Sequence, residues 1–391
     1  MAKWLEKTLG EVTAFIAKGI PPKYTEEENE NTIRVLNQKC NRNFEISYNE
    51  SRIHDCEKKK VPVDKMLRAG DVLINSTGTG TAGRVAQMVE VTVPTTIDGH
   101  MILMRPSEEL DPIYYGYAVK SFQSQIKELA EGSTGQTEIN RRRLQDEVII
   151  RYPSDKLVQK NIGSFLANID EKIKTNKEIN KNLEQQAVAV FNKFYATSTN
   201  QQPFTTLINV LGGGTPKTGN SEFWDGSIPF FTPKDVGTPY TFKTEKYITE
   251  LGLKHCNSRL YPTNTTFVTA RGTVGKISLA GVPMAMNQSC YALTSEIVDP
   301  LLVYFYVLKA VNALKHKASG AVFDAIVTRD FNGEIINILS DTDSEAALSI
   351  IKPMMEVIHN NSKENMRLSA ARDTLLPKLM SGELDVSGID L

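Results

Sequence analysis

Cysteine and histidine are scarce in this sequence, and neither is grouped in a way that suggests a metal site or a disulfide framework. The 391 residues include four cysteines that lie far apart, with no C-x-x-C pair. We therefore expect reduced thiols and a cytoplasmic location. The five histidines form no H-E-x-x-H pattern or similar spacing, so the sequence offers no candidate zinc ligands.

Long apolar runs and an excess of charge of one sign are also missing. No stretch approaches the roughly 20 apolar residues of a membrane helix, and the first residues, MAKWLEKTLGE, contain no apolar signal core. The 45 basic residues nearly balance the 46 acidic ones. The sequence therefore predicts no membrane association, and it restricts any nucleic-acid contact to local basic patches.

What the sequence does contain is an internal repeat. Short similar segments recur in the same order in both halves, and the offset between partners shrinks in steps along the chain. Loop deletions in the second half would produce such a shrinking offset. The collinear matches predict two copies of one unit. They pair Gly19 with Gly214, Lys39 with Lys234, Gly83 with Gly275, Asp111 with Asp299 and Arg141 with Arg329.

Each copy ends in a long helical pattern whose apolar residues alternate in steps of four and three, the heptad spacing of a coiled coil. The second pattern repeats the first at a constant offset, although Pro353 and Pro377 within it predict a kink. Two interpretations stay open: paired helices whose register is fixed by buried asparagines, or amphipathic helices with a solvated middle. The asparagines at matching central positions are Asn176 and Asn180 in the first pattern and Asn361 and Asn365 in the second.

The remainder of each copy is predicted to be an α+β domain. Short β-type runs, such as 72–74, 266–268 and the alternating Val89, Val91 and Val93, stand between glycine, proline and asparagine turns. An Asp-Pro pair predicts one helix per copy, over 112–130 and 300–317. The predicted order is domain, long helix, domain, long helix.

One motif suggests a nucleotide site but fails on its context. Gly78, Gly80 and Gly83 are spaced as G-x-G-x-x-G, and Asp98 follows twenty residues after the first of them. A dinucleotide site requires a helix after the third glycine, whereas strand-type residues follow here, and the second copy keeps no three-glycine set. The pattern instead indicates a strand–turn–strand loop whose glycines allow close approach of the backbone.

Other motifs also favour a binding protein over an enzyme. The segment 111–114 only partly matches the D-P-P-Y motif of adenine methyltransferases, and helix capping explains its Asp-Pro pair. The glycine-rich segment 212–218 lacks the G-K-[ST] of a P-loop. No histidine, serine or cysteine belongs to a recognisable catalytic constellation. We therefore assign no catalytic residue.

Several motifs together resemble one family, the specificity subunits of type I restriction–modification enzymes. The segment GGTPK at 213–217, followed by FW at 223–224 and TPKD at 232–235, resembles the opening of a target-recognition domain, and KGIPPKY at 18–24 resembles another variant of it. The segment NKEIN at 176–180 is similar to the central conserved region of the family. Its C-terminal counterpart resembles LLPKLMSGEL at 375–384. The resemblance covers nearly the whole chain.

The resemblance implies an α+β fold with two pseudo-symmetric target-recognition domains, at 1–153 and 199–342, joined by two long antiparallel helices, at 154–198 and 343–391. Each domain would read one half of a bipartite site in double-stranded DNA. The helices would set the spacer and dock two methyltransferase subunits. The resemblance places S-adenosylmethionine, ATP and Mg on the methyltransferase and restriction subunits, and no cofactor or metal on this chain.

Candidate DNA contacts follow from the repeat. Cationic residues that recur in both copies suit phosphate contact, which is independent of sequence: Lys23, Lys39, Arg84 and Arg141 in the first copy, and Lys217, Lys234, Lys276 and Arg329 in the second. Base readers should differ between copies, and each could instead be a solvated turn residue or a strand cap. The candidates are Asn37, Gln38, Asn75, Ser76, Thr77, Gln136 and Asn140 in the first copy, and Thr232, Arg271, Asn287, Gln288 and Phe323 in the second.

Three alternatives remain beside this interpretation. The first is a stand-alone bipartite DNA-binding or antirestriction protein without a catalytic partner. The second is a nucleotide-dependent oxidoreductase, which micromolar binding of NAD would support. The third is a coiled-coil scaffold, which gives no reason for two diverged domains.

Overall fold

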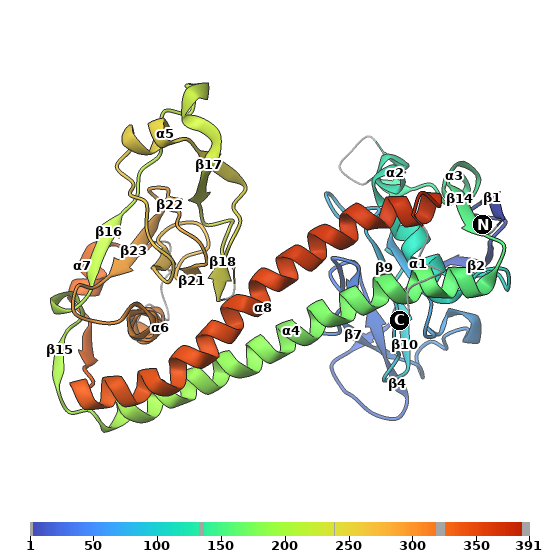
Figure 1. Cartoon of the computed structure of the whole chain (residues 1–391). Helices are drawn as coiled ribbons and strands as arrows, with labels where there is room; N and C mark the ends of the chain where they lie inside the picture. The colour runs from blue at the N-terminus through green and yellow to red at the C-terminus, as the bar shows by residue number, and fades with distance from the viewer. Residues whose placement is uncertain (1–2, 133–136, 238, 318–324, 385–391) are drawn as a thin grey trace. The chain divides into compact units, whose positions relative to one another are not determined.

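The computed structural model describes residues 3–132, 137–237, 239–317 and 325–384 (Figure 1). The chain divides into two compact units. Unit 1 consists of Met1–Lys172 with Leu368–Leu391, and unit 2 consists of Ile173–Arg367. Two long helices, α4 (Lys156–Thr197) and α8 (Asp341–Ser381), each contribute residues to both units.

Unit 1 is built on a four-stranded antiparallel sheet in the order β2-β11-β8-β9, and a second four-stranded sheet has the order β10-β4-β7-β3. The short helix α1 and parts of α4 and α8 share one apolar core with the first sheet. The strands are β1 (Trp4–Thr8), β2 (Thr13–Lys18), β3 (Tyr24–Thr25), β4 (Thr32–Leu36), β5 (Asn41–Arg42), β6 (Glu45–Ile46), β7 (Arg52–Asp55), β8 (Val72–Asn75), β9 (Val85–Gln87), β10 (Thr95–Ile97), β11 (Met101–Pro106), β12 (Ala130–Glu131), β13 (Glu138–Ile139) and β14 (Ile149–Pro153). The helices are α1 (Pro112–Ser121), α2 (Gln123–Glu128) and α3 (Arg141–Glu147).

Unit 2 has a five-stranded sheet in the order β16-β23-β20-β21-β18 and a three-stranded sheet in the order β19-β17-β22. Helix α6 packs with α4 and α8 in the main apolar core of this unit. The strands are β15 (Gln201–Pro203), β16 (Asn209–Gly212), β17 (Trp224–Phe231), β18 (Tyr240–Thr241), β19 (Lys246–Ile248), β20 (Thr266–Thr269), β21 (Ile277–Ala280), β22 (Ala285–Met286), β23 (Cys290–Thr294) and β24 (Ile335–Asn337). The helices are α5 (Glu250–Lys254), α6 (Pro300–Lys317) and α7 (Thr328–Asn332).

The two units repeat one topology, which confirms the duplication predicted from sequence. The order β2-β11-β8-β9 in unit 1 recurs as β16-β23-β20-β21 in unit 2. The parallel pair β10–β4 likewise recurs as β22–β17, and the antiparallel pair β1–β14 recurs as β15–β24. The structure corrects one detail of the sequence alignment. Gly19 corresponds to Gly213, not Gly214. A Cβ at Gly19 would lie 2.1 Å from the Asp98 carbonyl oxygen, and a Cβ at Gly213 would lie 2.1 Å from the carbonyl oxygen of Asn287, the equivalent residue of unit 2.

Two predicted elements differ from those in the structure. The helix expected over 112–130 is interrupted at Phe122 and forms α1 and α2, whereas α6 matches its predicted range. The alternating valines 89–93 form no strand, and Val89 is 84% exposed. The alternation of valines with other residues at 89–93 therefore does not correspond to the buried face of a strand. Pro353 and Pro377 both lie within α8, which continues through them.

The helices α4 and α8 pack together as an antiparallel pair. Within unit 2 they bury Ala187 and Phe191 of α4 against Ile351 and Ile358 of α8, together with residues of α6. Within unit 1, Leu166 of α4 and Leu379 of α8 belong to the core under α1. Among the described residues, no helix is both long and apolar enough to cross a membrane.

Candidate nucleic-acid interface

Three connecting loops of unit 1 meet at one surface. They follow β4 (residues 37–40), join β8 to β9 (76–84), and join β10 to β11 (98–100). Hydrogen bonds tie them together: Asn75 donates from Nδ2 to the Gln38 carbonyl at 3.0 Å, and the Ser76 amide donates to the His100 carbonyl at 2.8 Å. The surface is therefore a single structure made from segments that are distant in sequence.

Unit 2 brings the equivalent three loops together by the same backbone contacts. The Asn287 amide donates to the Phe231 carbonyl at 3.0 Å, as the Asp98 amide donates to the Leu36 carbonyl at 2.9 Å in unit 1. The Ala270 amide donates to the Ser289 carbonyl at 2.8 Å, which repeats the contact between Ser76 and His100. We call these two surfaces the loop surfaces. They consist of residues 37–40, 76–84 and 98–100 in unit 1, and 232–235, 270–276 and 287–289 in unit 2.

The first loop of each surface presents a lysine on a capped turn. In unit 1 the Lys39 amide donates to Asn37 Oδ1 at 2.8 Å. In unit 2 the Lys234 amide donates to Thr232 Oγ1 at 3.4 Å, and Thr232 is itself held by Asp235 at 2.6 Å. The side chains of Asn37 and Thr232 thus shape the turn, while both lysines are exposed. Lys234 also forms an exposed ion pair with Glu245, at 3.6 Å, which solvent screens.

Four of the candidate phosphate contacts, Lys39, Arg84, Lys234 and Lys276, lie within the loop surfaces. Lys23, Lys217 and Lys276 are exposed. Arg84 is half-buried, and its Nη2 donates to the Gly80 carbonyl at 3.3 Å. Arg141 and Arg329 are both exposed at the start of a short helix, α3 and α7 respectively.

The candidate base readers fall into different environments. In unit 1, Thr77 is half-buried and pairs with the His100 ring at 2.9 Å, and Gln38 is also half-buried. Asn75 and Ser76 are completely buried, so neither side chain can reach a base edge in this conformation. The Asn75 side chain instead supports the neighbouring loop through its hydrogen bond to the Gln38 carbonyl. Asn140 caps α3, with its Oδ1 accepting from the amides of Arg142 and Arg143, so its amide oxygen is already engaged.

In unit 2 the candidates are more accessible. Arg271 and Gln288 are exposed, Asn287 is half-buried, and Gln288 accepts a hydrogen bond from the Thr215 hydroxyl. Asn287 also accepts from the Ser289 amide at 3.0 Å, which shapes the third loop. Gln136 and Phe323 lie outside the residues that the structure describes.

Sequence reasoning missed three residues at these surfaces. His100 is exposed beside Thr77, and its amide donates to Asp98 Oδ1 at 2.9 Å. Burial raises the pKa of the Asp98 carboxyl, although this hydrogen bond partly offsets the shift. Lys127 and Lys315 lie against the hairpin glycines Gly83 and Gly275. Lys127 and Lys315 are separated by the same number of residues as the repeat partners Arg141 and Arg329. This shared spacing between the two copies is the sequence signal that could have identified them.

The four helix asparagines meet in the core of the α4–α8 pair in unit 2. Asn176 Nδ2 donates to Asn365 Oδ1 at 2.9 Å, and Asn361 Nδ2 donates to Asn180 Oδ1 at 2.9 Å. Asn176 is 1% exposed and Asn180 8%. The asparagines of α4 are therefore not exposed to solvent where they face α8. These contacts favour the interpretation in which buried asparagines fix the register of the paired helices.

The molecule is thus a duplicated α+β protein with matching surface loops of a kind suited to nucleic acid. A family model described as "Type I restriction modification DNA specificity domain" matches residues 1–185 and 205–365. The chain belongs to this family and carries two such domains.

Comparison with individual proteins agrees with this assignment. The chain is 28% identical over 162 residues to the type I restriction enzyme MjaIX specificity subunit of Methanocaldococcus jannaschii, across 40% of this chain and 38% of that protein. It is 38% identical over 100 residues to the EcoR124I/EcoR124II specificity subunit of Escherichia coli, across 24% of each. These alignments therefore span well under half of either relative.

A solved structure shares the fold over nearly the full length. The S subunit of a type I restriction–modification system from M. genitalium aligns with a TM-score of 0.61 at 16% identity, covering 97% of this chain and 96% of that one. At this identity the likeness concerns the fold alone.

Proposed function

We propose that this chain is the sequence-specific DNA-binding subunit of a type I restriction–modification complex, and that each unit reads one half of a bipartite site. The observation that carries the proposal is the pair of loop surfaces. Their backbone contacts are the same and Lys39 recurs as Lys234, whereas other polar side chains on the same loops differ. A shared frame with different side chains is what two reading heads for two different half-sites require.

The recurring cations suit the phosphate contacts of such a site. A phosphate contact fixes the position of a protein on the duplex without reading the sequence. The same cation is therefore useful in both units. The proposed set consists of Lys23, Lys39, Arg84, Arg141, Lys217, Lys234, Lys276 and Arg329.

The non-recurring polar residues suit base reading. Gln38 and Thr77 of unit 1 stand where Pro233 and Arg271 stand in unit 2, on the same loops. Amide side chains pair with adenine, and arginine pairs with guanine. We propose Gln38 and Thr77 as readers in unit 1, and Arg271 and Gln288 as readers in unit 2. The buried Asn75 and Ser76 are left out of this set.

The helix pair suits a spacer. Helix α4 has 42 residues, which corresponds to about 63 Å at ~1.5 Å per residue, and it contributes to both units. The asparagine contacts oppose sliding of α4 along α8, because a slip would leave buried amides without partners. We propose that these contacts keep the spacer length constant.

We further propose that two methyltransferase subunits dock on the helix pair and that restriction subunits complete the complex in the cytoplasm. In this assembly S-adenosylmethionine, ATP and Mg belong to the partner subunits, and this chain performs recognition without catalysis. In the described residues, no group of three or more histidine, cysteine, aspartate or glutamate side chains could hold a metal ion.

Methylome sequencing tests the proposal. The chain is expressed with its neighbouring methyltransferase gene in a host that lacks other adenine methylation. The expected result is one methylated motif with two specified halves and an unspecified spacer of constant length. A continuous motif would contradict the two-head proposal. Methylation that is independent of this chain would contradict its role in the complex and favour a stand-alone DNA-binding protein.

A further inference from the structure

The hairpin loops of the two loop surfaces rest on a helix at equivalent points. In unit 2 the loop between β20 and β21 approaches α6 at Gly275, which is buried and has a φ of +71°. In unit 1 the loop between β8 and β9 approaches α2 at Gly83, which is also buried and has a φ of +79°. The next residue in each loop is a proposed phosphate contact, Lys276 or Arg84.

A lysine of the helix is the point of contact in both units, but the contacts differ in kind. Lys315 donates from Nζ to the Gly275 carbonyl at 2.7 Å. A Cβ at Gly275 would lie 2.6 Å from Lys315 Cε. A Cβ at Gly83 would lie 2.7 Å from Lys127 Cγ, but also 2.8 Å from Lys127 Cα and 2.9 Å from its backbone nitrogen. In unit 2 the contact is therefore made by the tip of a lysine side chain, whereas in unit 1 the helix backbone itself lies against the glycine, together with the root of the lysine side chain.

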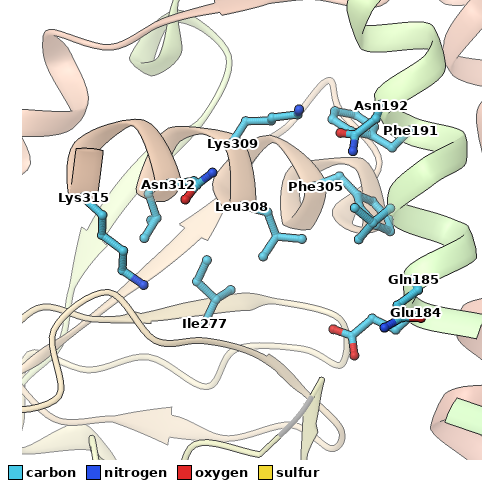
Figure 2. Close-up of a pocket in the computed structure, with 12 residues that line it drawn as sticks. Glu184, Gln185, Phe191, Asn192, Ile277, Phe305, Leu308, Lys309, Asn312 and Lys315 are labelled. Atoms are coloured by element: carbon cyan, nitrogen blue, oxygen red, sulfur yellow. The ribbon is translucent and has the colours of Figure 1, made fainter. Parts of the chain in front are cut away.

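The direction of the Lys315 side chain supports this distinction. Figure 2 shows Lys315 reaching from α6 toward the strand that carries Ile277, whereas Lys309 of the same helix extends toward Asn192 of α4. Both lysines line a cavity of about 500 Å³ whose walls come from α4, α6 and β21. The ammonium of Lys315 thus points at the base of the hairpin.

The rest of the hairpin is closed by hydrogen bonds to one threonine. The Gly275 amide donates to the Thr269 carbonyl at 2.8 Å, and the Lys276 amide donates to Thr269 Oγ1 at 3.0 Å. These bonds hold the loop together internally. The hydrogen bond from Lys315, by contrast, ties this end of the loop to a helix.

We infer that Lys315 is a positioning residue for DNA binding by unit 2: its ammonium fixes the carbonyl of Gly275 and thereby the place of Lys276. This inference rests on the proposed function for its effect on DNA, but the anchoring of the loop is a property of the free protein. A hydrogen bond from a charged donor is about twice as strong as a neutral one. Lys315 therefore limits the motion of a loop that has no helix backbone directly beneath it.

Hydrogen exchange in the full chain without DNA tests the anchoring. In Lys315→Met, which keeps the aliphatic stem and loses the donor, the amides of Gly275 and Lys276 should exchange about tenfold faster. Lys315→Arg, which keeps a cationic donor, should restore most of the protection. Lys127→Met is the matched control and should leave the amides of Gly83 and Arg84 unchanged, because Gly83 rests on the helix backbone. Equal protection in the wild type and in Lys315→Met would overturn the inference.

DNA binding by the same variants separates this inference from the proposed function. Lys276→Ala and Lys315→Met should each weaken binding to the cognate site, and the double variant should be little weaker than Lys276→Ala alone. Additive losses, each with its own decrease in salt dependence, would show that Lys315 contacts phosphate independently. If the wild-type chain assembled with its methyltransferase subunits binds no DNA specifically, the proposed function fails, and the exchange experiment still decides whether Lys315 anchors the loop.

Discussion

Asn176 and Asn365 face each other inside the α4–α8 pair, with Asn176 Nδ2 donating to Asn365 Oδ1 at 2.9 Å. They occupy different positions in the two helical patterns, and a second, reciprocal pair joins Asn361 to Asn180. Two amide contacts one helical turn apart define a single alignment of antiparallel helices. A shift by a heptad would place at least one buried amide against an apolar residue, which costs about 1–3 kcal/mol for each unsatisfied group.

Removing one member of this contact should cost more than removing both. Asn176→Leu leaves the Asn365 amide without its partner, so the free energy of unfolding should fall by about 1–3 kcal/mol. The double variant Asn176→Leu with Asn365→Leu should recover most of this loss, because apolar residues suit the helix seam. Chemical denaturation measures both values.

The exposed Asn360 of α8 provides the control for this comparison. In Asn360→Leu the free energy of unfolding should change by less than about 0.5 kcal/mol, as is usual for a surface substitution. A double variant that is less stable than the single one would contradict this account.

The proposed phosphate contacts predict a characteristic dependence on salt. Lys39→Ala and Lys234→Ala should each weaken binding to any DNA and reduce the slope of log K against log salt by about 0.9. The preferred sequence should stay the same, because phosphate contacts carry no sequence information. Fluorescence anisotropy at several salt concentrations measures the slope. Lys193→Ala, on the exposed side of α4, is the control, and an unaltered slope in both loop variants would exclude these lysines as phosphate contacts.

Lys120 predicts a pH dependence of the stability of unit 1. Burial lowers the pKa of its ammonium to about 8, although Asp170 at 3.8 Å acts in the opposite direction. Arg372, which forms an ion pair with Asp170, also lowers it, and the rings of Phe44 and Tyr117 cover the ammonium. Between pH 8 and the ordinary lysine pKa of about 10.5 the unfolded chain binds the proton more strongly, so stability rises with pH in this window.

The test compares the wild type with Lys120→Met by denaturation at pH 7 and at pH 10. The wild type should gain up to about 3 kcal/mol relative to the variant, since each unit of pKa difference corresponds to about 1.4 kcal/mol. The comparison cancels the titration of groups that both proteins share. Parallel stability curves for the two proteins would show that Lys120 titrates normally.

The spacer role predicts the result of a matched insertion. Seven residues added after Asn180 in α4, with seven added at the facing position of α8, keep the heptad pattern and add about 10 Å at ~1.5 Å per residue. The methylated motif should gain about three spacer base pairs at ~3.4 Å each, and both half-sites should stay unchanged. A one-sided insertion in α4 serves as the control and should impair assembly, because the asparagine contacts and the apolar contacts of Ala187 and Phe191 with α8 could no longer form in one register. An unchanged spacer in the matched variant would exclude the helices as the ruler.

The sequence predicted the parts of the fold that depend on periodicity and repetition. The heptad steps predicted α4 and α8, and Asp299-Pro300 predicted the start of α6, where Asp299 accepts from the Leu301 amide at 3.0 Å. The interruption at Phe122 was not predicted, because no proline or glycine marks it. Val89 to Val93 misled the strand prediction, since alternation alone does not show whether a face is buried.

The candidate site was only partly predictable for a different reason. Repeat logic identifies positions that recur, but it does not show which side chains point outward. Asn75 and Ser76 are polar turn residues by sequence, yet they lie at the end of a completely buried strand and support the neighbouring loops. Lys315 has a sequence signal, the offset from Lys127 that it shares with Arg141 and Arg329, but that offset does not reveal its hydrogen bond to a carbonyl 40 residues away. Contacts of this kind become visible only once the loops are placed in space.

A domain exchange followed by methylome sequencing tests the central claim most directly. Residues 1–153 are replaced by the corresponding domain of a family member with a known site, and the chimera is expressed with the same methyltransferase. We predict a motif in which one half changes to that of the donor, while the other half and the spacer length are retained. A motif in which both halves change, or in which neither does, would contradict the account of two independent reading units.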